Sequence, residues 1–302
     1  MKKAFPKWIK WRAPDPAMLK SMQALLKDLN LHTICESAQC PNMGYCFSRR
    51  TATFLILGDV CTRSCTFCGV KKGIPLPVDQ NEPAAVTEAV RRLGLKYAVI
   101  TSVTRDDLSD GGASQFAEVI SRLHELDMNI TVEVLIPDFK GSFAALRSVA
   151  KAGPQVINHN IETIRRLYPN VRPGAVYEQS LAVLANIKHI QPDIITKSGM
   201  MLGLGETAEE VIDAMRDLRH ADCDLLTMGQ YLQPSPTHHE IKSFVSPEIF
   251  SEYASMALEL GFKGAAAAPL VRSSFKADEL YQTAGRMTHH PETETKGRIH
   301  AD

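Results

Sequence analysis

The sequence lacks the features that mark membrane, secreted or nucleic-acid-binding proteins. It contains no run of about 18 apolar residues, which a membrane-spanning helix requires. Its N-terminus has no apolar core of a secretory signal peptide. The formal net charge is zero, with 34 basic and 34 acidic side chains, so no overall field attracts nucleic acid or an anionic membrane. These absences favour a cytoplasmic protein with neither a membrane nor a nucleic acid as partner.

Cysteine is nearly absent outside one short segment. Six of the seven cysteines lie between positions 35 and 68, and Cys223 stands alone. In a large chain without a secretory signal, clustered cysteines indicate metal binding rather than a disulfide framework, and the odd total points the same way. Cys223 is expected to pack as a small core residue.

Short apolar, β-branched runs alternate with amphipathic segments along most of the chain. The sequence predicts strands at 53–57, 98–103, 130–136, 156–159, 194–202, 225–231 and near 264–268. It predicts intervening helices at 83–93, 113–126, 142–152, 176–189, 208–220 and 247–260. Such alternation is typical of βαβ units and a parallel sheet. Six repeats favour an α/β fold built as a partial (β/α)6 TIM-type barrel.

The length and composition suit one barrel with short additions at both ends. A chain of 302 residues that is 44% hydrophobic can bury the core of one barrel-sized domain. We expect an N-terminal extension at 1–50, with one helix near 17–29, and the barrel at 51–270. A C-terminal segment at 271–302 would end in a polar tail.

Cys61, Cys65 and Cys68 form a C-x3-C-x2-C loop directly after the first expected strand. Barrel enzymes carry their chemistry in the loops that follow the strands. Three thiolates bind three irons of a [4Fe-4S] cluster and leave the fourth iron open, where S-adenosylmethionine (SAM) can bind through its amino and carboxylate groups. Zinc favours paired C-x2-C groups with a fourth ligand, and no histidine follows at a suitable spacing. The loop therefore predicts a radical SAM enzyme with these three catalytic cysteines.

Cys35, Cys40 and Cys46 form a second group with C-x4-C-x5-C spacing. Three soft thiolates suit either zinc or an iron–sulfur cluster. Beside a radical SAM loop, a second [4Fe-4S] cluster is the better interpretation, and it too would lack one ligand.

Three polar residues on the expected strands are candidates for binding SAM. Glu133 could bind its ribose hydroxyls, Lys197 could pair with its carboxylate, and Asn158 ends a strand beside the expected pocket. Glu133 and Lys197 could equally belong to a structural ion pair. The adjacent His238 and His239, in a polar segment, are expected at the surface.

The two cysteine groups, in this order, resemble those of the lipoyl synthases, a family of radical SAM enzymes. Further short motifs that resemble those of the family lie at 31–36, 40–44, 51–59, 101–113, 132–139, 158–163, 171–175, 196–207 and 229–235. The resemblance runs from about residue 8 to residue 278. The sequence departs from the family at Phe275, where the family has tyrosine, and at 265–268, where it has a more polar stretch.

The resemblance implies a sulfurtransferase that adds sulfur at C6 and C8 of an octanoyl group. The group would be held by a lipoyl carrier domain, either the glycine cleavage H protein or a 2-oxoacid dehydrogenase E2. A donor such as ferredoxin or flavodoxin would reduce the first cluster, which cleaves SAM to a 5′-deoxyadenosyl radical. The second cluster would be consumed as the sulfur donor.

Ser273 is implied, by the resemblance, as the fourth ligand of the second cluster. By itself the Ser273–Ser274 pair would be interpreted as a helix N-cap. Two alternatives to the lipoyl synthase hypothesis remain at this point. One is another radical SAM enzyme that inserts sulfur or a methylthio group, and the other is a non-catalytic iron–sulfur or zinc protein.

Overall fold

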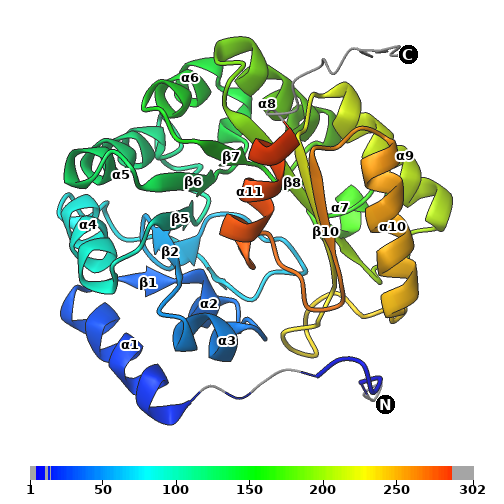
Figure 1. The fold of residues 1–302 in the computed structure, drawn as a ribbon, viewed down its shortest axis with the longest axis horizontal. Helices are drawn as coiled ribbons and strands as arrows, with labels where there is room; N and C mark the ends of the chain where they lie inside the picture. The colour runs from blue at the N-terminus through cyan, green and yellow to red at the C-terminus, as the bar shows by residue number, and fades with distance from the viewer. Residues whose placement is uncertain (1–4, 11–12, 14, 288–302) are drawn as a thin grey trace, which may run out of the picture.

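The computed structural model describes residues 5–10, 13 and 15–287, and the polar tail expected beyond them lies outside this part of the chain. Its main sheet has eight strands in the order β1-β2-β5-β6-β7-β8-β9-β10. The bounds are His32–Thr33, Thr53–Ile56, Tyr97–Ser102, Thr131–Leu135, Val156–Asn158, Ile195–Leu202, Leu225–Gln230 and Gly264–Ala267. All neighbours pair in parallel except β1, which is antiparallel to β2. The predicted partial barrel is confirmed, and Figure 1 shows its strands curving around a central axis.

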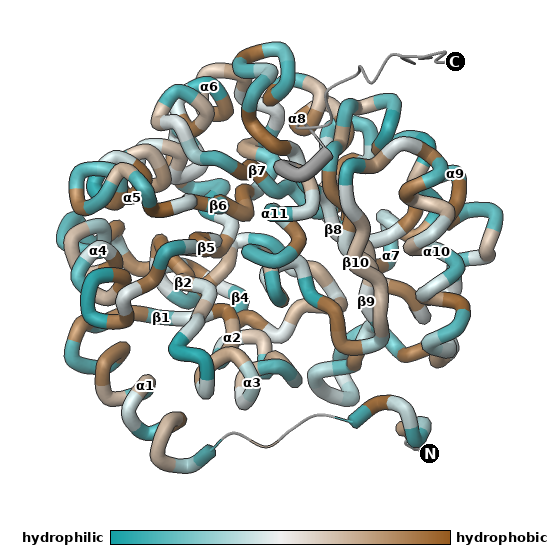
Figure 2. Tube along the Cα trace, in the orientation of Figure 1, coloured by the Kyte–Doolittle hydropathy of each residue, from teal (hydrophilic) through white to brown (hydrophobic). Residues whose placement is uncertain are grey.

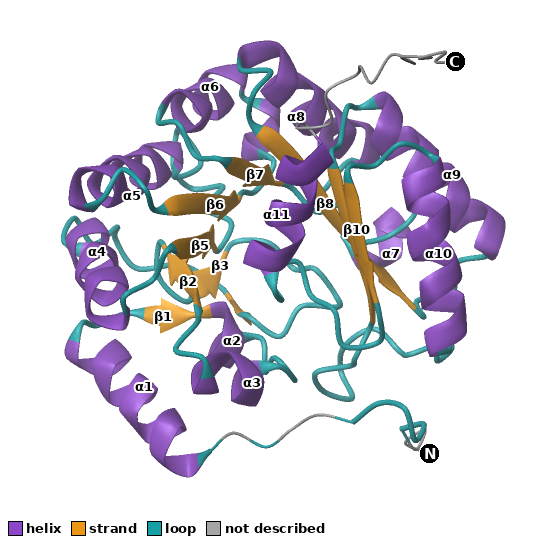
Figure 3. Ribbon diagram, viewed as in Figure 1, coloured by secondary structure: helices purple, strands orange, loops and turns teal. Residues whose placement is uncertain are grey.

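Helices cover the outside of the barrel (Figure 3). They are α4 (Glu82–Leu93), α5 (Ala113–Leu126), α6 (Phe143–Lys151), α8 (Tyr177–Ile190), α9 (Ala208–His220) and α10 (Pro247–Glu259). In α5, the buried Phe116, Val119, Ile120 and Leu123 recur at helical spacing and form the stripe that faces the sheet. Figure 2 shows hydrophilic residues on the outer turns of these helices. No helix in the described ranges is both long and apolar enough to cross a membrane.

The N-terminal extension consists of α1 (Pro16–Asp28) and the short helices α2 (Ile34–Ser37) and α3 (Met43–Ser48). Asp15 caps α1 by accepting hydrogen bonds from the amides of Ala17 and Met18. The sequence predicted α1 but missed α2 and α3, because four and six residues are too few to display a helical period.

A small two-stranded ribbon lies at the base of the first cysteine loop. Strands β3 (Val60–Cys61) and β4 (Lys71–Lys72) pair in parallel on the two sides of the loop. The amide of Gly73 also donates to the Cys61 carbonyl over 3.0 Å. The ribbon therefore holds the two ends of the cysteine loop side by side.

The C-terminal segment folds back across the barrel after β10. A Cβ on Gly229 would collide with the Val271 carbonyl, so the returning chain lies directly on β9. It continues into α11 (Ala277–Met287), whose Leu280 and Ala284 pack on Leu225 at the start of β9. Because α11 contacts the strand beginnings, it covers the end of the barrel opposite the loops that follow the strands.

The loops between these elements also include two 3-10 turns, η1 (Phe139–Gly141) and η2 (Arg165–Leu167), and the short helix α7 (Tyr168–Val171). The turn η1 directly follows β6, and η2 with α7 follow β7. Both therefore lie among the loops at the carboxyl ends of the strands, where a barrel carries its functional site.

Candidate functional site

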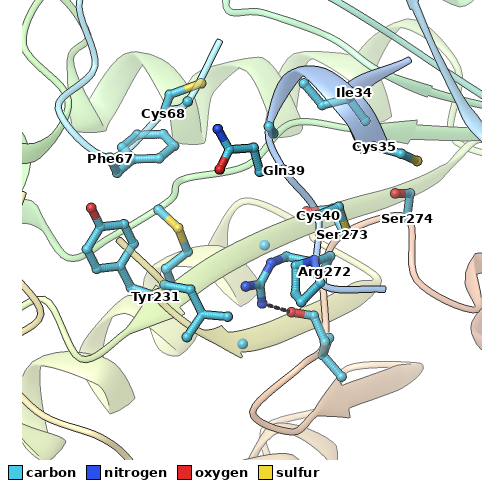
Figure 4. Close-up of a pocket in the computed structure, with 18 of the residues that line it drawn as sticks. Ile34, Cys35, Gln39, Cys40, Phe67, Cys68, Tyr231, Arg272, Ser273 and Ser274 are labelled. Atoms are coloured by element: carbon cyan, nitrogen blue, oxygen red, sulfur yellow. Dashed lines mark hydrogen bonds between the residues drawn. The ribbon is translucent and has the colours of Figure 1, made fainter. Parts of the chain in front are cut away.

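A cavity of about 680 Å3 lies at the carboxyl ends of the strands and is lined by residues from three distant segments. Cys35 and Cys40 come from the N-terminal extension, Cys68 from the loop after β2, and Ser273 from the C-terminal segment. Figure 4 shows Cys68 with Phe67 across the cavity from Cys35, Cys40 and Ser273. The fold therefore brings members of both cysteine groups and the candidate serine to one space.

The first cysteine group lies in a partly buried loop. Cys61, Cys65 and Cys68 are free thiols of intermediate exposure, and the Phe67 ring lines the cavity beside them. Burial raises the pKa of Cys68 to about 12 and also raises the pKa of Cys65. Iron binding must therefore displace protons from these thiols.

The second cysteine group lies on α2, on α3 and on the segment between them. Thr33 caps α2 by accepting from the amide of Glu36, which fixes the turn that carries the buried Cys35. The amide of Cys40 donates to the Cys35 carbonyl over 2.9 Å, and Cys46 lies within α3. Burial raises the pKa of Cys35 to about 12 and that of Cys46 to about 11.

Both groups offer three soft thiols, a donor set that fits iron–sulfur clusters. In the described chain, no three His, Cys, Asp or Glu side chains surround one point closely enough to hold a single metal ion. The ligands of a four-iron cube do not converge on one ion, because each cysteine binds a different iron.

Ser273 sits in an oxygen-lined niche of the cavity. Its hydroxyl donates to Oδ1 of Asn160 over 3.0 Å, and Nδ2 of Asn160 donates to Oε1 of Glu162 over 3.0 Å. A Cβ on Gly199 would lie 2.8 Å from the side-chain oxygens of Ser273, Asn160 and Thr227. Glycine at this position keeps the niche open. Helix α11 begins only at Ala277, so the N-cap interpretation of Ser273 is wrong.

Two charged side chains complete the polar part of the cavity. Glu162 has a left-handed backbone, with φ of 65°, and burial raises the pKa of its carboxyl. The half-buried Arg272 lies near Cys40 and Glu162, and burial lowers the pKa of its guanidinium. Glu162 and Arg272 were not predicted as site residues, although both lie within or beside a motif that the sequence analysis had singled out.

Glu133 and Lys197 face each other inside the barrel. Nζ of Lys197 donates to the two carboxylate oxygens of Glu133 over 2.8 and 3.1 Å, and the side chains are 0% and 1% exposed. The Tyr97 hydroxyl donates to Glu133 over 2.6 Å. Neither charged residue lines the cavity. Asn158 is fully buried as well, and neither polar atom of its amide has a hydrogen-bond partner in the described chain.

His238 and His239 are half-buried and contact the first cysteine loop, so the expectation of two surface histidines is wrong. Nε2 of His238 lies 3.1 Å from the Cys68 carbonyl, which makes this nitrogen the protonated one. The amide of His239 donates to the Thr66 carbonyl over 2.9 Å. The loop after β9 thus folds over the cysteine loop, a contact between residues 170 positions apart.

Known proteins are similar to this chain over most of its length. The sequence profile of the Radical SAM superfamily matches residues 55–218, which is more than half of the chain. The lipoyl synthase of Caldanaerobacter subterraneus subsp. tengcongensis is 56% identical over 273 residues, or 90% of this chain and 95% of that protein. The lipoyl synthase of Thermus thermophilus is 50% identical over 281 residues, or 92% of this chain and 87% of that protein.

Solved structures of low sequence identity share the fold. Methylornithine synthase superposes with a TM-score of 0.52 at 14% identity, covering 91% of this chain and 94% of that chain. SuiB of Streptococcus suis, bound to S-adenosylmethionine, superposes with a TM-score of 0.54 at 11% identity, covering 80% and 51%. At these identities the likeness demonstrates a shared fold, the partial barrel, and not a shared function.

Proposed function

Because the chain belongs to the lipoyl synthase family of radical SAM enzymes, we propose that it inserts two sulfur atoms, at C6 and C8, into a protein-bound octanoyl group. The observation that carries this proposal is the single cavity lined by Cys68, by Cys35 and Cys40, and by Ser273. A reaction that uses two iron–sulfur clusters on one substrate needs both of them to face the same space.

In this proposal, Cys61, Cys65 and Cys68 hold one [4Fe-4S] cluster with an open iron for SAM. Cys35, Cys40, Cys46 and Ser273 hold the second. When bound, these groups supply the radical and the sulfur atoms. The chain's own contribution is to orient them and to keep water away from the reacting carbons.

The lining of the cavity suits an acyl chain. Apolar side chains from several elements face it, among them Ile34, Met43, Leu135, Met200 and Met201. Methionine side chains are flexible and adapt to an irregular apolar ligand. The cavity thus combines apolar walls with the oxygen-lined niche that holds the candidate ligand Ser273.

Glu133 and Lys197 act, in this proposal, as a structural ion pair rather than as SAM contacts, which their complete burial supports. Asn158 stays a proposed cofactor contact, because a buried amide without partners is costly unless a ligand or water satisfies it. We further propose three functional segments, with the second cluster's cysteines in 1–50, the radical SAM barrel in 51–270 and the serine ligand in 271–302.

The partners follow from the same proposal. The octanoyl group would arrive on a lipoyl carrier domain, the glycine cleavage H protein or a 2-oxoacid dehydrogenase E2. A reducing protein such as ferredoxin or flavodoxin would supply electrons. We place the reaction in the cytoplasm.

The test is incubation of the iron-loaded chain with SAM, a reductant and an octanoylated carrier peptide, followed by mass spectrometry of the peptide. A gain of two sulfur atoms is expected. Cys35→Ala should abolish this gain while SAM cleavage persists, and Cys223→Ala is the matched control because Cys223 is buried outside the cavity. Formation of 5′-deoxyadenosine without any gain of sulfur by the peptide would overturn the proposal.

Iron analysis separates this function from a non-catalytic metal-binding role. Two cubes require about eight irons and an equal amount of sulfide in each chain. Zinc in place of iron at the second cysteine group would contradict the sulfur-donor role.

A further inference from the structure

Arg63 lies inside the first cysteine loop, and the proposed function gives its side chain no part. We propose that Arg63 is a positioning residue that locks this loop onto the barrel through Asp106 and Asp138. The inference rests on the proposed cluster at Cys61, Cys65 and Cys68. It adds a clamp, formed by the side chains of Arg63, Asp106 and Asp138, that determines how the loop holds that cluster.

The guanidinium of Arg63 makes two forked pairs at once. Its Nε and Nη2 donate to Asp106 over 2.8 and 3.0 Å, and its Nη1 and Nη2 donate to Asp138 over 2.8 and 2.7 Å. The side chains of Arg63 and Asp138 are 8% and 0% exposed, so water does not weaken this contact. Paired, planar hydrogen bonds of this kind are among the strongest and most directional in proteins.

The two carboxylates belong to different strand ends. Asp106 follows β5 and Asp138 follows β6, and these strands are neighbours in the barrel. The loop is also joined to the first of these segments by Thr62, whose hydroxyl donates to the Thr104 carbonyl over 2.9 Å and accepts from the Asp106 amide over 3.0 Å. Arg63 therefore fastens the cysteine loop to the segments that directly follow two neighbouring strands.

The turn that presents Asp138 is strained. Phe139 and Lys140 both adopt left-handed backbones, with φ of 46° and 51°, although neither is glycine. The Asp138 carboxylate stabilises this turn by accepting from the Lys140 amide over 3.0 Å. Such strain persists where the surrounding structure over-determines it, and it gathers at functional sites.

The backbone of Arg63 links the clamp to a ligand of the proposed cluster. The Arg63 amide points at Sγ of Cys61 over 3.5 Å. Hydrogen bonds to the cysteine sulfurs tune the reduction potential of a cluster. Fixing the side chain of Arg63 thus fixes an amide that faces a ligand sulfur.

Lysine cannot replace arginine in this geometry. Its ammonium is a point charge, whereas the flat guanidinium directs donors at two carboxylates simultaneously. Arg63→Lys therefore keeps the charge and removes the fork, which separates positioning from simple electrostatics.

The experiment compares Arg63→Lys with Arg216→Lys in the full-length chain. Arg216 pairs with Asp213 on the exposed face of α9, so its replacement controls for loss of an ordinary surface ion pair. Both are made in a chain whose second cysteine group is replaced by alanine, which leaves one cluster to observe. The readouts are the rate of iron loss to a chelator, the reduction potential, and the change in the electron paramagnetic resonance spectrum when SAM is added.

We expect Arg63→Lys to lose iron about 10-fold faster or more, as for other residues that support metal ligands, and to show a shifted potential. Arg216→Lys should match the parent on every readout. Equal iron loss and equal potential in both variants would overturn the inference.

If Arg63→Lys fails to fold, judged by circular dichroism, the same measurements on Asp106→Asn decide the matter. That carboxylate is 25% exposed and asparagine has the same shape, so the fold should tolerate the change. Its predicted effects are the same in direction, and parent-like behaviour would again overturn the inference. Failure of the parent to hold a SAM-responsive cluster would instead count against the proposed function.

Discussion

The buried Lys197–Glu133 pair offers a quantitative test of how the barrel is stabilised. Two unit charges 2.8 Å apart attract each other by about 6 kcal/mol at an effective dielectric constant of about 20. The desolvation of both ions, several kcal/mol for each, offsets most of that gain. Removing one partner leaves the other charge buried and unpaired, so Lys197→Met should cost about 3–5 kcal/mol. Methionine keeps most of the lysine volume, which limits any additional cavity term.

The assay is thermal denaturation at equal iron loading, combined with SAM cleavage at a temperature well below the transition. At about 2–4 °C for each kcal/mol, the midpoint of Lys197→Met should fall by on the order of 10 °C. Lys96→Met is the matched control, since Lys96 pairs with Asp127 at 3.0 Å but is 77% exposed. Such surface pairs contribute about 0–1 kcal/mol.

The double variant Glu133→Gln with Lys197→Met should recover part of the lost stability, because it leaves no unpaired charge behind. The folded Lys197→Met protein should still cleave SAM. The opposite pattern, with an unchanged midpoint and lost SAM cleavage, would refute the structural role and restore Lys197 as a contact to the SAM carboxylate.

Three further substitutions test the cavity and its scaffold. Ser273→Ala should keep SAM cleavage and lose sulfur transfer to an octanoylated peptide, whereas full lipoyl formation would rule out its ligand role. Gly199→Ala should lower the iron content of the second cluster without unfolding the chain, because the new Cβ would crowd the Ser273 hydroxyl at 2.8 Å. Parent-like iron content would show that the niche tolerates a methyl group. Thr207→Ala removes the capping box of α9 and should cost about 1 kcal/mol in urea denaturation with unchanged sulfur transfer.

The order and type of the barrel elements could be predicted because each depends on local periodicity. The helix predicted at 208–220 was found with these bounds, since the spacing of Thr207 and Glu210 marks its beginning and its apolar residues recur on one face. The strand predicted at 225–231 was found one residue shorter. A strand of β-branched or apolar residues between two helices needs no distant information to be recognised.

The depth of a side chain inside the barrel could not be predicted in the same way. Alternation along a strand tells which residues face inward, but not which layer they occupy. Asn158 is the last residue of β7 and Asn160 lies two residues further on, yet only Asn160 lines the cavity. Layering depends on the register between strands, in which Asn158 stands beside Leu135 and Lys197. That register is set by pairings between segments far apart in the sequence, and no local pattern reports it.

Ser273 shows how a long-range contact changes the interpretation of a short motif. Locally, a serine pair followed by a polar segment favours a helix N-cap, and the helix does follow, but only from Ala277. The hydroxyl instead bonds to Asn160, 113 residues away, because the chain after β10 returns across β9 and enters the cavity. The Ser273 hydroxyl does not serve as a helix cap. It faces the cavity that members of both cysteine groups line, where it can exchange Asn160 for another partner. Ligation of iron by Ser273 therefore requires a change of hydrogen-bond partner within the cavity and no rearrangement of a helix.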